Sequence, residues 1–269
     1  MDVKAIVGKY EKCYKGKKYL FYPGSGKYML ISFTSAVKGE RYEMLSWYVR
    51  PAEPVEGATG SGDTAQTQPL STCAMADNLG DPAVLYLTEN DPGPEFNWYL
   101  KDEAIFQELI AKIMEENGLT NKQVITIGGS MGGTAALNYG LKNNVLGIIS
   151  YRPQIDFETS KTEFKNRHLE KEWIQSYELV TKLVAESHQS KSQIPQLPMI
   201  YLNYNNYAPD YASYKKFIDH VDKESIYLMI HNCGGTTHRA YGFTQPLCDS
   251  IIRHFLTLTD VTMYVRARN

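Results

Sequence analysis

The sequence has 269 residues, of which 43% are hydrophobic and 22% are charged, and its formal net charge is −2. This length suits one large α/β domain or two small ones, the composition is that of a globular protein, and we expect a single domain over residues 1–269. The net charge argues against a nucleic acid or an anionic membrane as the partner, because such proteins usually carry a basic surface. No apolar run is long enough to span a membrane, and the N-terminus lacks an apolar signal core, so we expect a cytoplasmic protein.

The N-terminal third is typical of strands. Its pattern predicts a hairpin of residues 4–10 and 18–22, a short apolar strand at 28–33 and a short helix at 41–48. Small and polar residues dominate 51–81, which predicts a long polar loop within the same domain.

From residue 84 onward, strand patterns alternate with helix patterns. This alternation predicts an α/β fold, with a mainly parallel, doubly wound sheet and helices on both faces. Helical spacing at 156–192 interrupts the alternation and predicts either a cap over the strand ends or an ordinary surface helix. The expected strands are 84–87, 124–128, 145–150, 199–203 and 226–230, and the expected helices are 103–116, 131–143, 212–221 and 245–256.

The cysteines are scattered, and none forms a Cys-x-x-Cys pair, which argues against a zinc ribbon or a redox pair. Isolated thiols fit a reducing compartment. The sequence therefore predicts no metal site and no tightly bound cofactor. The four cysteines are Cys13, Cys73, Cys233 and Cys248.

The most informative stretch joins the strand at 124–128 to the next helix. It has the pattern Gly-x-Ser-x-Gly, formed by Gly128, Ser130 and Gly132. A sharp strand-to-helix turn strains the central serine, and the glycines remove Cβ atoms that would collide there. The pattern predicts Ser130 as a nucleophile above the sheet. The alternatives are a bystander serine and a phosphate-binding turn, although the lysine and the spacing of a P-loop are absent.

A serine hydroxyl needs a general base, which in a doubly wound sheet is expected after the carboxyl end of a strand. His238 lies in a glycine-containing loop after the last expected strand and is our candidate. His231, which closes that strand, is the second. The other histidines lie in or near helices or in the insertion, namely His168, His188, His220 and His254.

The acid that orients the base should follow an earlier strand. Asp210 lies between the 199–203 strand and the next helix and is our candidate, with a helix N-cap as its alternative role. Asp219 and Asp222 lie later and are expected to face solvent.

Two backbone amides should stabilise the oxyanion that forms when a serine attacks an acyl group. The elbow supplies the amide of Met131. The loop after the 28–33 strand should supply the other amide, with Ser35 as our candidate and Thr34 as the next.

With these residues the chain resembles the α/β-hydrolase superfamily over residues 25–258, in which nucleophile, acid and base follow the same order along the chain. Residues 127–140 are similar to a bacterial branch with the pattern Gly-Ser-Ser-Lys-Gly-Gly-x-Ala-Ala-Leu-x-Tyr-Gly. Pro153 and Gln154 also resemble that branch, which includes capsular-polysaccharide O-acetyltransferases and accessory secretion proteins for glycosylated adhesins. The chain differs in having Met131 where the branch often has lysine.

The resemblance implies acyl transfer through an ester of Ser130, with acetyl-coenzyme A as a candidate donor. A sugar hydroxyl of a surface polysaccharide as acceptor makes the protein an O-acetyltransferase, whereas water makes it a carboxylesterase. A peptidase and a non-catalytic accessory protein that binds glycans or secretion partners are the alternatives. Four basic residues could bind the phosphates of the donor, although interleaved acidic residues favour a solvated face. They are Arg152, Lys161, Lys165 and Arg167.

Overall fold

The computed structural model describes residues 3–36, 42, 44–48, 81–89, 99–155, 198–220, 227–239 and 242–266. The expected polar loop at 51–81, apart from Asp81, and the expected insertion at 156–192 lie outside these residues.

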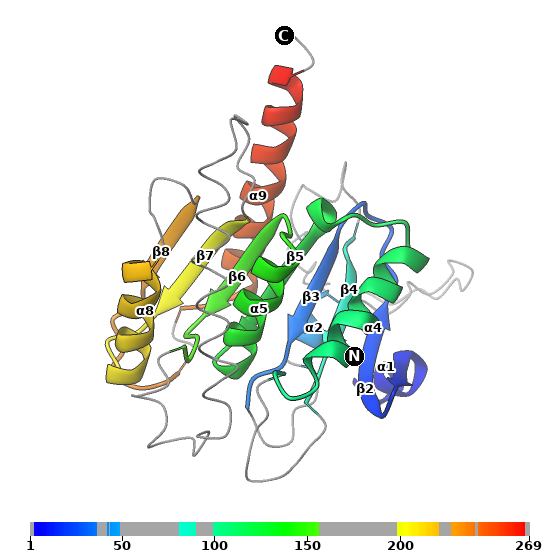
Figure 1. Ribbon diagram of the computed structural model, residues 1–269, viewed down its shortest axis with the longest axis horizontal. Coiled ribbons are helices and arrows are strands. Elements are labelled where there is room, and N and C mark those ends of the chain that lie inside the picture. Colours follow the sequence, from blue (N-terminus) through cyan, green and yellow to red (C-terminus); the bar gives the residue numbers. More distant parts are fainter. Residues whose placement is uncertain are drawn as a thin grey trace, which may run out of the picture.

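An eight-stranded sheet forms the centre of the described fold, in the order β1-β2-β4-β3-β5-β6-β7-β8 (Figure 1). Strands β3 to β8 all run parallel, and β2 is antiparallel to both β1 and β4. The sheet is therefore mainly parallel, as the sequence predicts. The strands are β1 (Glu11–Tyr14), β2 (Lys17–Tyr22), β3 (Met29–Phe33), β4 (Ala83–Leu87), β5 (Val124–Gly129), β6 (Gly147–Tyr151), β7 (Met199–Tyr204) and β8 (Leu228–Asn232).

Helices cover both faces of this sheet (Figure 1). In Figure 1, α4 (Glu103–Glu116), α5 (Met131–Lys142) and α8 (Ala208–His220) lie in front of the sheet. Side chains of α9 (Gln245–Arg266) pack with the opposite face, together with those of α1 (Val3–Tyr10) and α2 (Leu45–Tyr48). Because both faces are covered, every residue of β3 to β7 is buried, which explains their nearly continuous apolar sequences.

The expected N-terminal hairpin is wrong in its first strand. Residues 3–10 form α1, and the hairpin joins β1 to β2 through a turn at Lys15 and Gly16. Ile6, Val7 and Tyr10 pack against the sheet face that also contacts α9. Their spacing of one and four residues places them on one side of a helix. This short apolar pattern fits a strand or a helix, and packing against the sheet selects the helix.

Most later elements lie where the sequence predicts them, with different ends. Helix α8 begins at Ala208, four residues earlier than expected, because Pro209 is tolerated in the first helical turn. Helix α9 continues to Arg266, ten residues further than expected. A short 3-10 turn, η1 (Asn121–Gln123), precedes β5.

Within the described part of the chain, none of the helices combines the length and apolar character needed to cross a bilayer. Parallel strands bring their carboxyl ends to one edge of the sheet, the lower edge in Figure 1. The residues that follow β5, β6, β7 and β8 therefore meet at that edge.

Candidate active site

Strand β5 leads into α5 through Ser130 alone. Ser130 has φ 53° and ψ −121°, a backbone conformation that costs about 1–3 kcal/mol in a residue with a side chain. Neighbouring backbone leaves no room for further side chains. A Cβ on Gly128 would lie 2.2 Å from the Gly132 carbonyl oxygen, and one on Gly132 would lie 2.1 Å from the Phe33 carbonyl oxygen. The strained strand-to-helix turn that the motif predicts is thus present.

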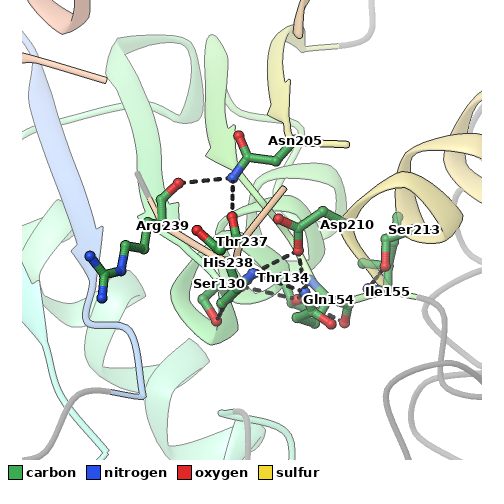
Figure 2. Close-up of polar contacts among 10 residues, drawn as sticks. All are labelled: Ser130, Thr134, Gln154, Ile155, Asn205, Asp210, Ser213, Thr237, His238 and Arg239. Carbon is green, nitrogen blue, oxygen red and sulfur yellow. Dashed lines mark hydrogen bonds and ion pairs between the residues drawn. The ribbon is translucent and has the colours of Figure 1, made fainter. Parts of the chain in front are cut away.

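Ser130, His238 and Asp210 form one hydrogen-bonded chain (Figure 2). His238 Nε2 lies 2.8 Å from Ser130 Oγ, and His238 Nδ1 lies 2.6 Å from Asp210 Oδ1. An ionised carboxylate can only accept, so we assign the ring proton to Nδ1. The Nε2 lone pair then accepts from the Ser130 hydroxyl, which is the arrangement that general-base catalysis requires.

Asp210 is fully buried in the first turn of α8, where the positive end of the helix dipole favours a carboxylate. Its Oδ1 accepts from the His238 ring. Its Oδ2 has no hydrogen-bond partner among the residues that the structure describes. The expected alternative role as an N-cap does not fit, because Asp210 is the third residue of α8 rather than the residue before it.

Besides the His238 ring, a side-chain amide also donates to Asp210 Oδ1. Gln154, after β6, is completely buried and donates from Nε2 to Asp210 Oδ1 at 2.6 Å. The same nitrogen lies 3.3 Å from His238 Nδ1. Both nitrogens carry hydrogens that point at the carboxylate, so this last contact is a close approach of two donors rather than a hydrogen bond.

Asn205, the first residue after β7, holds the segment that carries the base. Its Nδ2 donates to the carbonyl oxygens of Thr237 at 2.9 Å and of Arg239 at 2.8 Å, the residues on either side of His238 (Figure 2). The Asn205 side chain is completely buried. One amide group therefore fixes the backbone on both sides of the base.

The predicted oxyanion amides lie next to the elbow. Met131 is the first residue of α5, where an amide has no acceptor within the helix. The loop after β3 touches the elbow, since the Phe33 carbonyl and the Thr34 carbonyl carbon lie against the Cβ position of Gly132. The Thr34 amide donates to the Leu87 carbonyl at 3.1 Å, which argues against Thr34 as the second donor. Ser35 stays our prediction.

Two of the other candidate histidines contact tyrosine hydroxyls. His231 lies within β8 with Nδ1 2.7 Å from the Tyr201 hydroxyl, and His254 contacts the Tyr227 hydroxyl. His168 and His188 lie outside the described residues. Of the candidate acids, Asp219 is exposed and pairs with Lys215.

Of the four basic residues that could bind the phosphates of an acyl donor, only Arg152 lies among the described residues. Arg152 is buried, with its guanidinium carbon 5.5 Å from the centre of the Tyr151 ring. The other three lie outside the described residues. The described residues also contain no group of three His, Cys, Asp or Glu side chains that could hold a metal ion.

Sequence reasoning gave no role to Gln154 or Asn205. Both are polar residues placed just after a strand of a parallel sheet, which is the signal that selected Asp210 and His238. The rule therefore places both amides at the edge of the sheet that carries Ser130, but it does not give their hydrogen-bond partners.

No protein-family model matches the sequence, and a comparison with curated proteins gives no match. Solved structures do resemble it. A variant of the capsule O-acetyltransferase of Neisseria meningitidis serogroup A, in complex with CoA, superposes with a TM-score of 0.59 at 15% identity, covering 90% of this chain and 94% of that chain. A ferulic acid esterase gives 0.55 at 9% identity, covering 91% and 95%.

A third neighbour is the Glycosylation Associate Protein complex from Streptococcus agalactiae, with a TM-score of 0.52 at 12% identity, covering 94% of this chain and 46% of that chain. At sequence identities this low, the similarity shows a shared backbone fold and nothing more. The sheet order, the helices on both faces and these neighbours together confirm the predicted fold class. The chain has the α/β-hydrolase fold.

Proposed function

We propose that this protein is a serine enzyme that transfers an acyl group through an ester of Ser130. The observation that carries the proposal is the hydrogen-bonded chain from the strained Ser130 through His238 to the buried Asp210. The structural neighbours support it, since they include an O-acetyltransferase and an esterase.

In this mechanism Ser130 Oγ attacks the acyl carbon while His238 Nε2 takes the hydroxyl proton. The resulting oxyanion accepts hydrogen bonds from the amides of Met131 and Ser35. Collapse of the intermediate breaks the bond to the leaving group, which takes the proton from His238. Asp210 orients the ring and stabilises its protonated form during both steps. An acceptor hydroxyl then gives its proton to His238 and attacks the ester. The bond from the acyl carbon to Ser130 Oγ breaks, and His238 returns the proton to that oxygen.

For the acyl donor and acceptor, we propose acetyl-coenzyme A and a sugar hydroxyl of a surface polysaccharide, so that the protein is an O-acetyltransferase. The fold similarity to a capsule O-acetyltransferase with bound CoA supports this choice. A coenzyme A donor would also place the reaction in the cytoplasm. The second candidate function is a carboxylesterase with water as the acceptor, which the similarity to a ferulic acid esterase favours.

A fluorophosphonate probe tests the nucleophile. We expect the probe to label wild-type protein at Ser130, and Ser130→Ala to remain unlabelled and to lose at least about 10⁴-fold in kcat on a p-nitrophenyl ester. Ser250→Ala, which changes an exposed serine on α9, is the matched control and should behave as wild type. A folded wild-type protein that neither reacts with the probe nor cleaves the ester would instead support a non-catalytic accessory role.

The acceptor is tested by supplying acetyl-coenzyme A with and without bacterial polysaccharides. Release of free thiol that depends on polysaccharide supports the transferase. Release of acetate at the same rate without polysaccharide supports the esterase.

A further inference from the structure

We propose that Gln154 is a positioning residue for the acid and the base, which holds the Asp210 carboxylate against His238 and ties both to the helix of the nucleophile. The inference rests on the proposed function and adds to it a residue outside the Ser130, His238 and Asp210 set.

Few described contacts hold the Asp210 carboxylate. Within the described part of the chain, Asp210 Oδ2 is buried without a hydrogen-bond partner, so Oδ1 carries the hydrogen bonds. Oδ1 accepts from His238 Nδ1 and from Gln154 Nε2, each at 2.6 Å. During catalysis the His238 ring gains and loses a proton at Nε2. The Gln154 amide does not titrate, so it gives the carboxylate one contact that stays constant through the cycle.

Hydrogen bonds to two helices hold Gln154 and the residue after it in place. Its backbone exchanges two hydrogen bonds with Thr134 Oγ1, which donates to the Gln154 carbonyl and accepts from its amide, both at 3.0 Å. Thr134 belongs to α5, whose first turn follows Ser130. The next amide, that of Ile155, donates to Ser213 Oγ at 3.0 Å, and Ser213 lies on α8 with Asp210.

The short segment after β6 therefore bridges α5, which begins directly after the nucleophile, and α8, which carries the acid (Figure 2). Thr134, Gln154 and Ser213 are all buried. Buried hydrogen bonds of this kind fix side-chain orientation, because breaking one leaves an unpaired polar group away from water. Gln154 is thus placed to transmit the position of α5 to Asp210.

The main test is Gln154→Met, which keeps the length of the side chain and removes the donor. We expect kcat on a p-nitrophenyl ester to fall about 10- to 100-fold with little change in KM, since a shift of about 1 Å in a catalytic group costs about 100-fold and Gln154 does not touch the substrate in the proposed mechanism. Gln107→Met is the matched control. It removes the acceptor of a hydrogen bond between α4 and the C-terminal end of α5 and should leave kcat unchanged.

A second test exchanges the carboxylate at position 210 and the amide at position 154. Its result distinguishes a positioning role of Gln154 from a purely structural one. Asp210→Asn should lower kcat about 10⁴-fold. Adding Gln154→Glu restores one carboxylate and one amide, with the carboxylate now about as far from His238 Nδ1 as the Gln154 nitrogen, which is 3.3 Å away. The double variant should recover at least about 10-fold in kcat over Asp210→Asn, because the relocated carboxylate can orient the same ring nitrogen. This variant also keeps both buried groups polar, so it guards against loss of folding in Gln154→Met.

The outcomes separate the two proposals. A folded wild-type protein that is inert to the ester and to the fluorophosphonate probe contradicts the proposed function. An active wild-type enzyme whose Gln154→Met variant keeps full kcat contradicts the role of Gln154, as does a double variant no better than Asp210→Asn. A fall in kcat at constant KM, with recovery in the double variant, supports it.

Discussion

Ser130 and His238 are adjacent in space but are held by different means. Ser130 is fixed by backbone geometry, since a Cβ on Gly128 or Gly132 would lie within 2.2 Å of a carbonyl oxygen. His238 lies on a loop in which no described residue comes within 4 Å of the Cβ position of Gly234, and the loop is held by the Asn205 amide. The position of the nucleophile is therefore set by close backbone packing around the elbow. The position of the base depends instead on a few hydrogen bonds between distant parts of the chain.

The largest effect on the nucleophile side is expected from Gly132→Ala. The new Cβ would meet the Phe33 backbone at 2.1 Å, and backbone cannot move aside as a side chain can. We expect a loss of about 3 kcal/mol in the free energy of unfolding, measured by urea denaturation, and a large fall in kcat because the loop carrying Ser35 is displaced.

Gly133→Ala is the matched control, because its nearest neighbours would lie 3.1 Å from the new Cβ. It should cost less than about 1 kcal/mol, partly offset by the higher helix propensity of alanine. Equal losses at the two positions would contradict the steric account of the elbow.

For the base, we expect Asn205→Ala to loosen the loop that carries His238 without unfolding the protein. It removes two hydrogen bonds, worth about 1 kcal/mol each, and leaves the carbonyls of Thr237 and Arg239 without this donor. We expect kcat and the rate of fluorophosphonate labelling to fall about 10-fold or more, since the imidazole is no longer held at 2.8 Å from Ser130 Oγ.

Asn206→Ala changes the adjacent exposed residue, whose Oδ1 accepts a hydrogen bond from Asn232 Nδ2 at 3.0 Å. It should leave both rates near wild type. Labelling of Asn205→Ala at the wild-type rate would mean that the loop keeps its conformation without the amide.

The same contrast explains which parts of the site could be predicted from the sequence. The elbow is encoded within five residues, so its geometry follows from the order of glycines around Ser130. Asp210 and His238 were found because they are titratable and follow strands. The Gln154 amide donates to a residue 56 positions away, and the Asn205 amide donates to residues 32 and 34 positions away. No local sequence pattern marks pairs that lie so far apart in the chain. The expected strand at 4–10 fails for a related reason, since packing against the sheet selects the helix.

A smaller effect is expected from Gly234→Ala in the base loop. Gly234 has φ +69°, which an alanine adopts at a cost of about 1 kcal/mol, but no atom of the described residues lies within 4 Å of the Cβ position. Strain without a clash should lower kcat only a few-fold and shift Tm by a few degrees, measured by steady-state kinetics and thermal unfolding. A loss as large as that of Gly132→Ala would show that the base loop is as tightly constrained as the elbow.

The smallest effect on activity is expected at Cys248, which lies on α9 and packs in the core on the face of the sheet away from α5. Burial raises the pKa of this thiol from 9.0 to about 12, and the Tyr48 hydroxyl donates to its sulfur at 3.0 Å. Unfolding exposes the thiol and returns its pKa to the ordinary value, so the unfolded chain releases the proton first. The stability that the neutral thiol contributes is complete below pH 9 and is lost as the pH rises toward 12. Cys248→Ala should therefore lose less stability than wild type between pH 9 and pH 11, measured by urea denaturation, while kcat at pH 7 stays unchanged. A fall in kcat would show that packing on the α9 face also sets the geometry of the base.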